Sequence, residues 1–320
     1  MFSTLTDVHA CRAGDPTIAL MEVRMHTEVR DQALFDVIGE DVRVEQVATG
    51  FGFTEGPVWD KARKQLIWSD MKHDHMRCWS PQRGVQTYRK PSNKANGNTY
   101  DAQGRLVSCE HGTSRVVREE RDGKLTVLAS HWQGRELNSP NDIVIKADGA
   151  VYFSDPTFGR IREDVGILRP LTLDFRGVYR IVPDRADMKL LIDDFEQPNG
   201  LCFSLDEKRL FINDTPRKHI RVFDVQPDGA IANGRIFGET TGDAPGAPDG
   251  MKIDSKGHVY CTGPGGIHVF DHGGRCLGVI LTPERPTNFA WGDDDLRTLY
   301  MTAQTSIYRA RLKTPGRLTY

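Results

Sequence analysis

Short apolar runs, separated by turn-forming residues and ended by polar ones, recur along most of this chain. The stretch 139–156 is typical: a Ser-Pro-Asn-Asp turn, an apolar Ile-Val-Ile run, an Ala-Asp-Gly turn and a second apolar run ended by Ser-Asp. Two antiparallel strands joined by such a turn return to the end that they left. We therefore expect Asn141 and Asp155 to lie at the same rim of a β-sheet.

Five other stretches repeat this pattern. They are Glu-Gly-Pro-Val-Trp at 55–59, Asn-Gly-Asn at 96–98, Pro-Asn-Gly-Leu at 198–201, Pro-Asp-Gly-Met at 248–251 and Pro-Thr-Asn-Phe at 286–289. Together with the first stretch they open six units, which follow one another every 39 to 58 residues. A period of this size is typical of the four-stranded blades of a propeller. The pattern predicts an all-β fold, a six-bladed β-propeller over residues 43–312.

Both ends of the chain lie outside the repeat. Residues 1–42 are predicted to form an N-terminal extension, in which 31–39 has the pattern of a short helix ended by glycine, and 313–320 to form a C-terminal tail. The segment 42–48 alternates apolar and polar residues, as a half-exposed strand does. We expect this strand to complete the last blade, because a closed ring leaves no open sheet edge.

One unit is longer than the others because of an insertion between Pro156 and Arg176. The insertion has little periodicity and contains two aromatic residues and four arginines. It directly follows Asp155, which is expected at a rim of the ring. We therefore predict that it overhangs the ring as a partial lid.

Composition and charge narrow the range of partners. The 320 residues are 38% hydrophobic and carry a formal net charge of -2, with charges of both signs spread along the chain. This pattern argues against a nucleic acid or a membrane surface as partner and favours a small molecule, while the oligomeric state stays open. The six cysteines are far apart with no Cys-x-x-Cys, and the first residues lack the features of a secretory signal. We expect reduced cysteines and a cytoplasmic protein.

Oxygen-bearing side chains recur at one position of the repeat. In a propeller the first strand of each blade lines the central channel, so the residues that open these strands converge on the axis. Those residues are Glu55, Asn96 or Asn98, Asn141, Asn199, Asp249 and Asn288. Carboxylate and amide oxygens without sulfur or imidazole favour one divalent cation, Ca²⁺ in the first place, with Mg²⁺, Mn²⁺ and Zn²⁺ as alternatives. Each motif alone is also an ordinary turn, so the prediction depends on the repetition.

The ordered set of motifs resembles the senescence marker protein (regucalcin), gluconolactonase and luciferin-regenerating enzyme family of six-bladed propellers, over about residues 45–312. The resemblance implies that Glu55, Asn199 and Asp249 hold a catalytic divalent metal, and that Asn141 joins them or binds substrate. The Asn-Gly-Asn motif and Cys-Glu-His-Gly at 109–112 look most like the bacterial gluconolactonases. Animal members have an arginine where this chain has Ser139, so their substrate contacts do not transfer.

The resemblance also implies a reaction, the hydrolysis of a sugar lactone to its aldonic acid. A divalent cation stabilises the oxyanion that forms when water attacks the lactone carbonyl. The family uses the carboxylate that corresponds to Asp249 for proton transfer as well as for metal binding, and His111 is the alternative general base. Asn98, Glu110 and Asn141 are candidates for hydrogen bonds to the sugar hydroxyls. Three aspartates at the ends of second strands are instead expected to cap blade turns: Asp70, Asp155 and Asp214.

Two other functions remain compatible with the same residues. A cation that polarises a carbonyl also polarises a phosphoryl oxygen, so a phosphotriesterase-type or other ester hydrolase is possible. A calcium-binding propeller without enzymatic activity is the second alternative, because a fold does not determine a function. The sequence has no dinucleotide fingerprint, phosphate loop or Gly-x-Ser-x-Gly motif, which argues against covalent serine chemistry.

Overall fold

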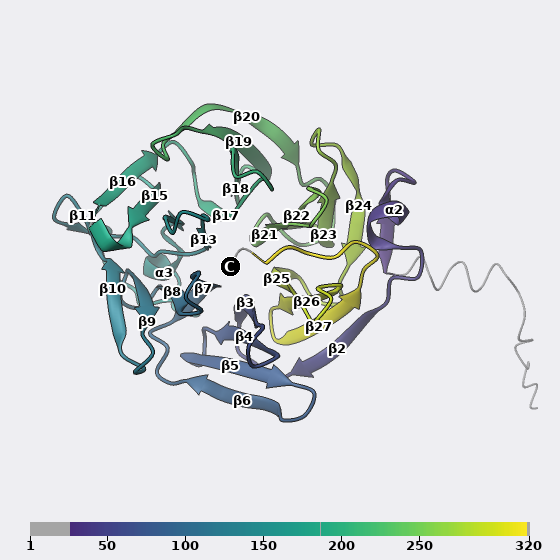
Figure 1. Cartoon of the computed structure of the whole chain (residues 1–320), viewed down its shortest axis with the longest axis horizontal. Helices are drawn as coiled ribbons and strands as arrows, with labels where there is room; N and C mark the ends of the chain where they lie inside the picture. The colour runs from purple at the N-terminus through teal and green to yellow at the C-terminus, as the bar shows by residue number, and fades with distance from the viewer. Residues whose placement is uncertain (1–25, 186, 319–320) are drawn as a thin grey trace, which may run out of the picture.

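The computed structural model describes residues 26–185 and 187–318. Its strands form six antiparallel sheets that surround a central axis as blades (Figure 1). Five sheets have four strands, and the sheet of the fifth blade has one more at its outer edge. The prediction of a six-bladed β-propeller is therefore confirmed.

The blades follow one another along the chain, and within each blade the first strand lies nearest the axis. The strands of the first three blades are β3 (Thr54–Asp60), β4 (Gln65–Asp70), β5 (His75–Ser80) and β6 (Gly84–Arg89), then β7 (Ala95–Tyr100), β8 (Leu106–Glu110), β9 (Arg115–Glu119) and β10 (Leu125–Ala129), then β13 (Ile143–Ile145), β14 (Val151–Asp155), β15 (Gly177–Val182) and β16 (Asp187–Ile192).

The last three blades are built in the same way. Their strands are β17 (Pro198–Phe203), β18 (Arg209–Asp214), β19 (His219–Val225) and β20 (Ile231–Glu239), then β21 (Met251–Ile253), β22 (Val259–Gly263), β23 (Gly266–Phe270) and β24 (Cys276–Leu281), then β25 (Pro286–Gly292), β26 (Thr298–Ala303), β27 (Ser306–Arg311) and the N-terminal strand β2 (Val44–Thr49). The elements outside the blades are β1 (Thr27–Val29), α2 (Leu34–Ile38), the hairpin β11 (His131–Trp132) and β12 (Arg135–Glu136), α3 (Phe158–Ile161) and a 3-10 helix, η1 (Pro183–Arg185).

The N-terminal strand β2 closes the ring. It pairs antiparallel with β27, from Val44 opposite Ala310 to Thr49 opposite Ser306, and so forms the outer strand of the sixth blade. This confirms the predicted closing strand. The predicted short helix is also present as α2, which ends at Gly39 in a positive-φ conformation.

The apolar core consists of six clusters, one between each pair of neighbouring blades. Between the first and the last blade, Trp59 stacks on Tyr300 with 5.5 Å between the ring centroids. Between the fifth and sixth blades, α2 contributes Leu34, Val37 and Ile38, all buried. Because each blade is packed on both faces, the side chains that open the inner strands are held in fixed positions around the axis.

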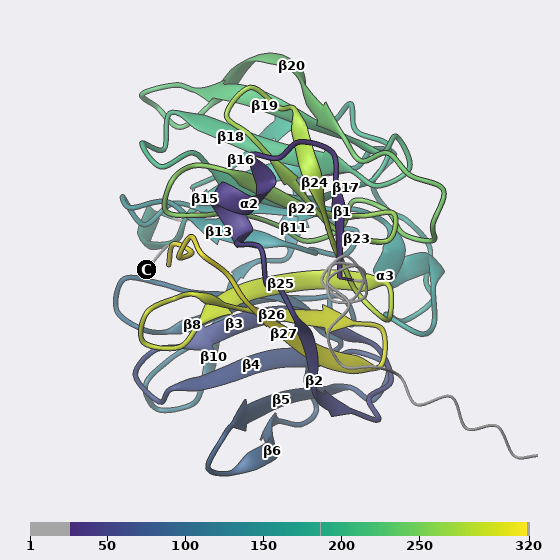
Figure 2. The same ribbon diagram turned by 90° about the vertical axis from the view of Figure 1, so that its right-hand side faces the viewer.

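The two ends of the central channel differ. Residues 313–318 run across one end, where the Gly316 N–H donates to the Leu296 carbonyl at 2.7 Å and Arg317 Nη1 to the Leu205 carbonyl at 2.6 Å. Helix α3 lies on the opposite face of the ring (Figure 2). The tail therefore covers one end, and the predicted metal ligands line a pocket at the end beside α3.

Two further findings concern the described residues only. No helix among them is long and apolar enough to cross a membrane. The five cysteines within this part of the chain are unpaired, in agreement with the expected reduced state: Cys78, Cys109, Cys202, Cys261 and Cys276.

Candidate functional site

A pocket of about 560 Å³ opens at the end of the channel beside α3. It is lined by Phe53, Glu55, Met71, Asn96, His111, Asn141, Phe158, Arg162, Val165, Asn199, Thr215, Ala247, Asp249, Arg285 and Pro286. The structure thus brings together all four predicted metal ligands: Glu55, Asn141, Asn199 and Asp249. A second cavity at the tail end has mostly apolar walls and none of these four residues, so it is not the candidate site.

Close contacts between inner strands of neighbouring blades set the spacing of these residues. The N–H of Gly200, the residue after Asn199, donates to the carbonyl of Asp249 at 3.0 Å. A Cβ atom at Gly200 would lie 2.1 Å from that oxygen, so any other residue would push the two strands apart. The pairing register of the inner strands also shifts near this end in four blades, which turns the opening side chains toward the axis.

Glu55 and Asp249 form a carboxyl pair at the floor of the pocket. Glu55 is buried, Asp249 is half-buried, and both side chains line the same pocket. Loss of solvent raises the pKa of both groups, and the negative charge of Asp249 raises the pKa of Glu55 further. The positive charge of Arg285 acts in the opposite direction on Asp249 without cancelling the rise. Two such groups cannot both ionise in this pocket unless a positive charge joins them.

Amide oxygens complete the polar floor. Asn199 Nδ2 donates to Thr215 Oγ1 at 3.2 Å, while the buried Oδ1 of Asn199 has no hydrogen-bond partner among the described residues. Asn96 has the same arrangement, with an unpartnered Oδ1. Buried acceptors without donors are unusual and suit a cation. No three His, Cys, Asp or Glu side chains gather in the described ranges to form a metal site by themselves, so a cation here needs these amide oxygens. The donor set fits a hard divalent ion.

Asn288 supports the carboxyl pair from below. Its Nδ2 donates to Glu55 Oε2 at 3.4 Å, and its Oδ1 accepts from Lys252 Nζ at 3.3 Å. The Lys252 ammonium also lies 3.6 Å from the carboxylate of Asp142, deeper in the channel. Asn288 therefore contacts the pocket floor and the charges beneath it, and does not line the pocket itself.

His111 lines the pocket as a neutral imidazole. Its Nδ1 lies 3.1 Å from the Val165 carbonyl and its Nε2 3.1 Å from Asn96 Nδ2, so the ring donates through Nδ1 and accepts through Nε2. Burial, together with the positive charges of Arg162 and Arg169, lowers the pKa of His111 to about 3. The ring therefore orients Asn96 and holds the insertion at Val165.

Two predicted substrate-binding residues are not brought to this pocket. Asn98 lies deeper, where Nδ2 donates to the Gly56 carbonyl at 2.8 Å and Oδ1 accepts from Ser108 Oγ at 2.6 Å. The Glu110 carboxylate is fully buried and accepts from Arg115 Nε and Thr113 Oγ1, both at 2.6 Å. The polar groups of both side chains are used within the blades. Asn141, by contrast, lines the pocket, and its N–H donates to the Ser154 carbonyl at 2.8 Å, at the rim expected from the hairpin.

The aspartates at the ends of second strands cap the blades, as expected. Asp70 Oδ1 accepts from the Gly52 N–H at 2.9 Å, Asp155 Oδ2 from the Asn138 N–H at 2.9 Å, and Asp214 Oδ2 from the Glu196 N–H at 2.9 Å. In each case the acceptor fixes the segment that leads into the first strand of the same blade.

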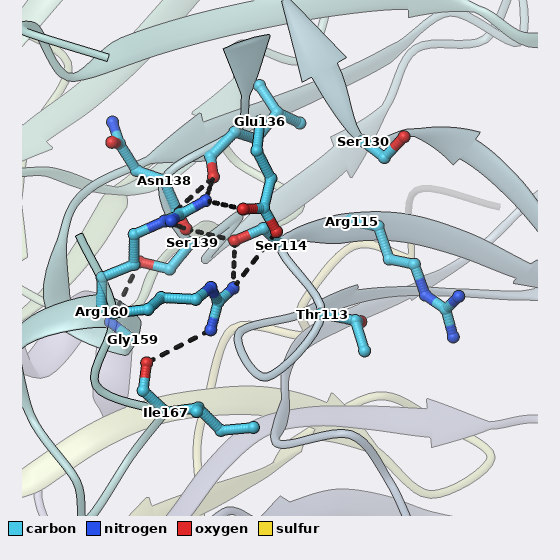
Figure 3. Close-up of polar contacts among 12 residues, drawn as sticks. Thr113, Ser114, Arg115, Ser130, Glu136, Asn138, Ser139, Gly159, Arg160 and Ile167 are labelled. Atoms are coloured by element: carbon cyan, nitrogen blue, oxygen red, sulfur yellow. Dashed lines mark hydrogen bonds and ion pairs between the residues drawn. The ribbon is translucent and has the colours of Figure 1, made fainter. Parts of the chain in front are cut away.

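The insertion forms one wall of the pocket and is anchored by a buried arginine (Figure 3). Arg160, at 2% exposure, donates to the carbonyls of Asn138 at 2.8 Å and Pro170 at 2.7 Å, and pairs with the Glu136 carboxylate at 2.7 Å. Gly159 lies so close to His111 that an added Cβ atom would be 2.7 Å from its ring. The predicted partial lid is thus a firmly held wall, from which Phe158, Arg162 and Val165 line the pocket.

Arg162 and Arg285 are pocket residues that sequence reasoning missed. Arg162 lies in the insertion and Arg285 in the loop before β25, and neither stands at the repeated motif position. The one available signal was the location of both residues beside rim segments, the insertion after Asp155 and the loop before the last Pro-Thr-Asn-Phe motif.

Fold and site together define a class: six-bladed propellers whose central channel ends in a pocket with carboxylate and amide oxygens on its floor. A family model described as the SMP-30/gluconolactonase/LRE-like region matches residues 53–305, and the chain belongs to this family. The family resemblance seen in the motifs is thereby confirmed.

Several relatives of the chain are named as lactonases. The chain is 31% identical to a gluconolactonase of Zymomonas mobilis subsp. mobilis, over 90% of this chain and 85% of the relative. It is 28% identical to a pentonolactonase of Haloferax volcanii, over 80% and 83%. A solved gluconolactonase structure from Xanthomonas campestris superposes with a TM-score of 0.83 at 33% identity and covers 89% of this chain and 94% of that one. The homology supports a carboxylic ester hydrolase of the lactonase type.

Proposed function

We propose that this protein is a divalent-metal-dependent hydrolase that opens a sugar lactone, glucono-1,5-lactone or a related aldonolactone, to the aldonic acid. The observation that carries the proposal is the pair of carboxyl groups of Glu55 and Asp249 in one open pocket, together with amide oxygens that have no partner among the described residues. Homology to lactonases supports the reaction class.

Glu55, Asn199 and Asp249 would hold the cation, with Asn141 as a fourth ligand or a close neighbour. Ca²⁺ suits this all-oxygen set best, and Mg²⁺, Mn²⁺ and Zn²⁺ are alternatives. When bound, such a cation keeps both carboxyl groups ionised and stabilises negative charge on a carbonyl oxygen of the substrate.

Asp249 is the proposed general base. Its carboxylate takes a proton from water as the water oxygen bonds to the lactone carbonyl carbon. The bond between that carbon and the ring oxygen then breaks, and the proton passes to the ring oxygen, which becomes a hydroxyl group of the aldonic acid. With the cation bound, Asp249 would be ionised, so its carboxylate could accept the proton.

His111 is the weaker candidate for the base. A pKa of about 3 leaves the imidazole little affinity for a proton, and both ring nitrogens already have partners. We propose that His111 orients Asn96 at the pocket wall, where Asn96 Nδ2 lies 3.1 Å from His111 Nε2.

A lactone panel in a pH-stat tests the proposal. Purified protein is assayed with glucono-1,5-lactone, other aldonolactones, a phosphotriester and a simple aryl ester, before and after removal of metal with a chelator and after return of each cation. The expected result is lactone opening that is lost with the chelator and restored by one divalent ion. If no lactone is opened and the phosphotriester is hydrolysed, a phosphotriesterase-type hydrolase replaces the proposal. If no substrate is turned over and calcium binds, a calcium-binding propeller without enzymatic activity replaces it.

A further inference from the structure

Arg285 lines the pocket, and no residue within 26–185 and 187–318 pairs with its side chain. The residue is exposed, immediately before β25, yet it lies close enough to the carboxyl pair to be the largest influence after burial on the pKa of Asp249. No described residue forms an ion pair or a hydrogen bond with its guanidinium group. An arginine held at a pocket mouth without a partner is available to a ligand.

A second guanidinium group lies on the same side of the mouth. Arg162 lies over the ring of Phe53, with its Cζ atom 5.8 Å from the ring centroid. Thr287 Oγ1 donates to the Thr54 carbonyl at 2.7 Å, which places the segment that follows Arg285 beside the segment that contains Phe53. Both arginines therefore belong to the part of the mouth where the first and sixth blades meet.

With a divalent cation in the metal site, the charged groups of the pocket sum to a net positive charge. This charge balance rests on the proposed function. Arg162 is neutralised by Asp164, with guanidinium-to-carboxylate distances of 2.6 and 3.2 Å, and Lys252 lies 3.6 Å from the carboxylate of Asp142. A divalent cation would neutralise the carboxyl pair on the floor. The charge of Arg285 is then left over, at the mouth, and it favours an anionic ligand.

We propose that Arg285 recognises an anionic substituent of the lactone substrate at the mouth of the pocket, which Arg162 also lines. The substituent is a phosphate, sulfonate or carboxylate on a carbon remote from the ring ester, so that the ester reaches the floor while the anion stays at the mouth. Guanidinium groups bind such oxyanions with two parallel hydrogen bonds, which also orients the sugar. The preferred substrate is accordingly an anionic aldonolactone.

The rival explanation is that Arg285 serves only to offset the carboxyl pair. In that case its replacement changes the rate with every lactone by the same factor, because the change acts on Asp249 and not on the substrate. The ratio of kcat/KM for an anionic and a neutral lactone separates the two explanations, since an effect common to both substrates cancels in the ratio.

The experiment compares wild type, Arg285→Gln, Arg285→Lys and Arg121→Gln. Arg121 is an exposed arginine in the second blade that forms no ion pair with a described residue, so it is the matched control for loss of one positive charge. Substrates are glucono-1,5-lactone, 6-phosphoglucono-1,5-lactone and glucaro-1,4-lactone, each corrected for its uncatalysed rate. Metal content is measured for every variant. We expect a phosphorylated-to-neutral ratio of about tenfold or more in wild type and Arg121→Gln, and near unity in Arg285→Gln.

Arg285→Lys keeps the charge without the planar fork, so we expect an intermediate ratio. The glucaro-lactone arm shows whether a carboxylate serves as well as a phosphate. A binding arm uses the stable products: calorimetric titration of the metal-loaded protein with 6-phosphogluconate and gluconate is expected to show a preference of about tenfold that Arg285→Gln abolishes.

The experiment distinguishes failure of the anion-site inference from failure of the lactonase proposal. If wild type opens the neutral lactone as well as or better than both anionic ones, the inference is overturned while the lactonase stands. An unchanged ratio in Arg285→Gln, with lower rates on all substrates, also overturns it in favour of the offset role. If no lactone is opened, the lactonase proposal fails and the titrations decide the anion site: loss of the 6-phosphogluconate preference in Arg285→Gln supports it, and equal affinities reject it.

Discussion

Among the pocket residues, Glu55 gives the most direct test of the metal site. It is buried at 2% exposure, and burial and the negative charge of Asp249 raise its pKa, so it needs a cation to ionise. Glu55→Gln removes that charge but keeps the shape of the side chain. We expect the variant to stay folded, to lose most bound metal and to lose activity by about 100-fold or more, since metal catalysis is worth several kcal/mol. Metal analysis after dialysis checks this, with the exposed Glu239→Gln as control, and full metal occupancy in Glu55→Gln would contradict it.

The assignment of the general base gives a second prediction. Asp249→Asn keeps an oxygen for a cation but cannot accept a proton, so kcat should fall by about 100-fold or more even at saturating metal. His111→Asn should keep the pH-rate profile of the wild type, because a group with a pKa of about 3 does not titrate near neutral pH. The fall in rate toward acidic pH should be lost in Asp249→Asn and kept in His111→Asn. Substantial turnover by Asp249→Asn, with a profile changed by His111→Asn, would reverse the two roles.

Asp155 gives a prediction about stability. Burial raises its pKa to about 7, although its carboxyl accepts the N–H groups of Asn138 and Ser139. In the unfolded chain the pKa is about 3.9, so the folded state holds the proton more tightly and stability falls as the pH rises from about 4 to about 7. Asp155→Asn removes this dependence. Relative to this variant, wild type should lose about 2 kcal/mol between pH 5 and pH 8 in urea unfolding. Parallel stability curves would show that Asp155 stays ionised in the fold.

The residues of the floor could be predicted because they hold one position in a repeat that the sequence displays. Two other candidates, Asn98 and Glu110, do not line this pocket, for local reasons. Asn98 lies just past a register shift in β7, which the alternation of a regular strand does not reveal, and the partner of Glu110 is Arg115, across a hairpin. Arg285 was missed because it lies in a loop whose course depends on the contact between the first and sixth blades.

The position of the insertion 156–176 depends on Arg160. Its guanidinium group satisfies three backbone carbonyls and pairs with Glu136 while almost fully buried. Arg160→Leu leaves those acceptors without donors and should cost roughly 3–5 kcal/mol, first as local opening of the insertion. Hydrogen exchange should rise in 156–176, and KM should rise because Phe158 and Val165 leave the pocket wall. Glu163→Gln, exposed on the same insertion, is the control; unchanged exchange in Arg160→Leu would show that other contacts suffice.

The elements differ in how far sequence alone predicts them. The hairpins, the helix α2 and the closing strand β2 each have a local pattern, so they could be foreseen. Strand β1 has only three residues, and its pairing with β24, from Thr27 opposite Ile280, depends on a partner some 250 residues away. Such a strand exists only once the fifth blade is built.

At the scale of the whole molecule, the chain closes its ring near both ends, because β2 is the outer strand of the sixth blade and residues 313–318 cross the channel. In addition, α2 buries Leu34, Val37 and Ile38 between the fifth and sixth blades. The blades therefore do not contribute equally to stability: the junction at the fifth and sixth blades also needs the segment that precedes the repeat.

A series of shortened chains separates the contribution of α2 to stability from that of β2. A chain that begins at residue 26 keeps β1, α2 and β2, and it is the reference for the two shorter chains. A chain that begins at residue 40 loses the three buried side chains of α2, about 1.5 to 3 kcal/mol each, and should be less stable by roughly 5 kcal/mol while it stays monodisperse with its pocket intact. A chain that begins at residue 50 also loses β2, which leaves β27 as an open, pairing-competent edge, so we expect it to aggregate. Size-exclusion chromatography and thermal unfolding distinguish the three. If the chain from residue 50 is as stable and monodisperse as the chain from residue 40, closure by β2 does not hold the ring together, and the packing between the blades is sufficient.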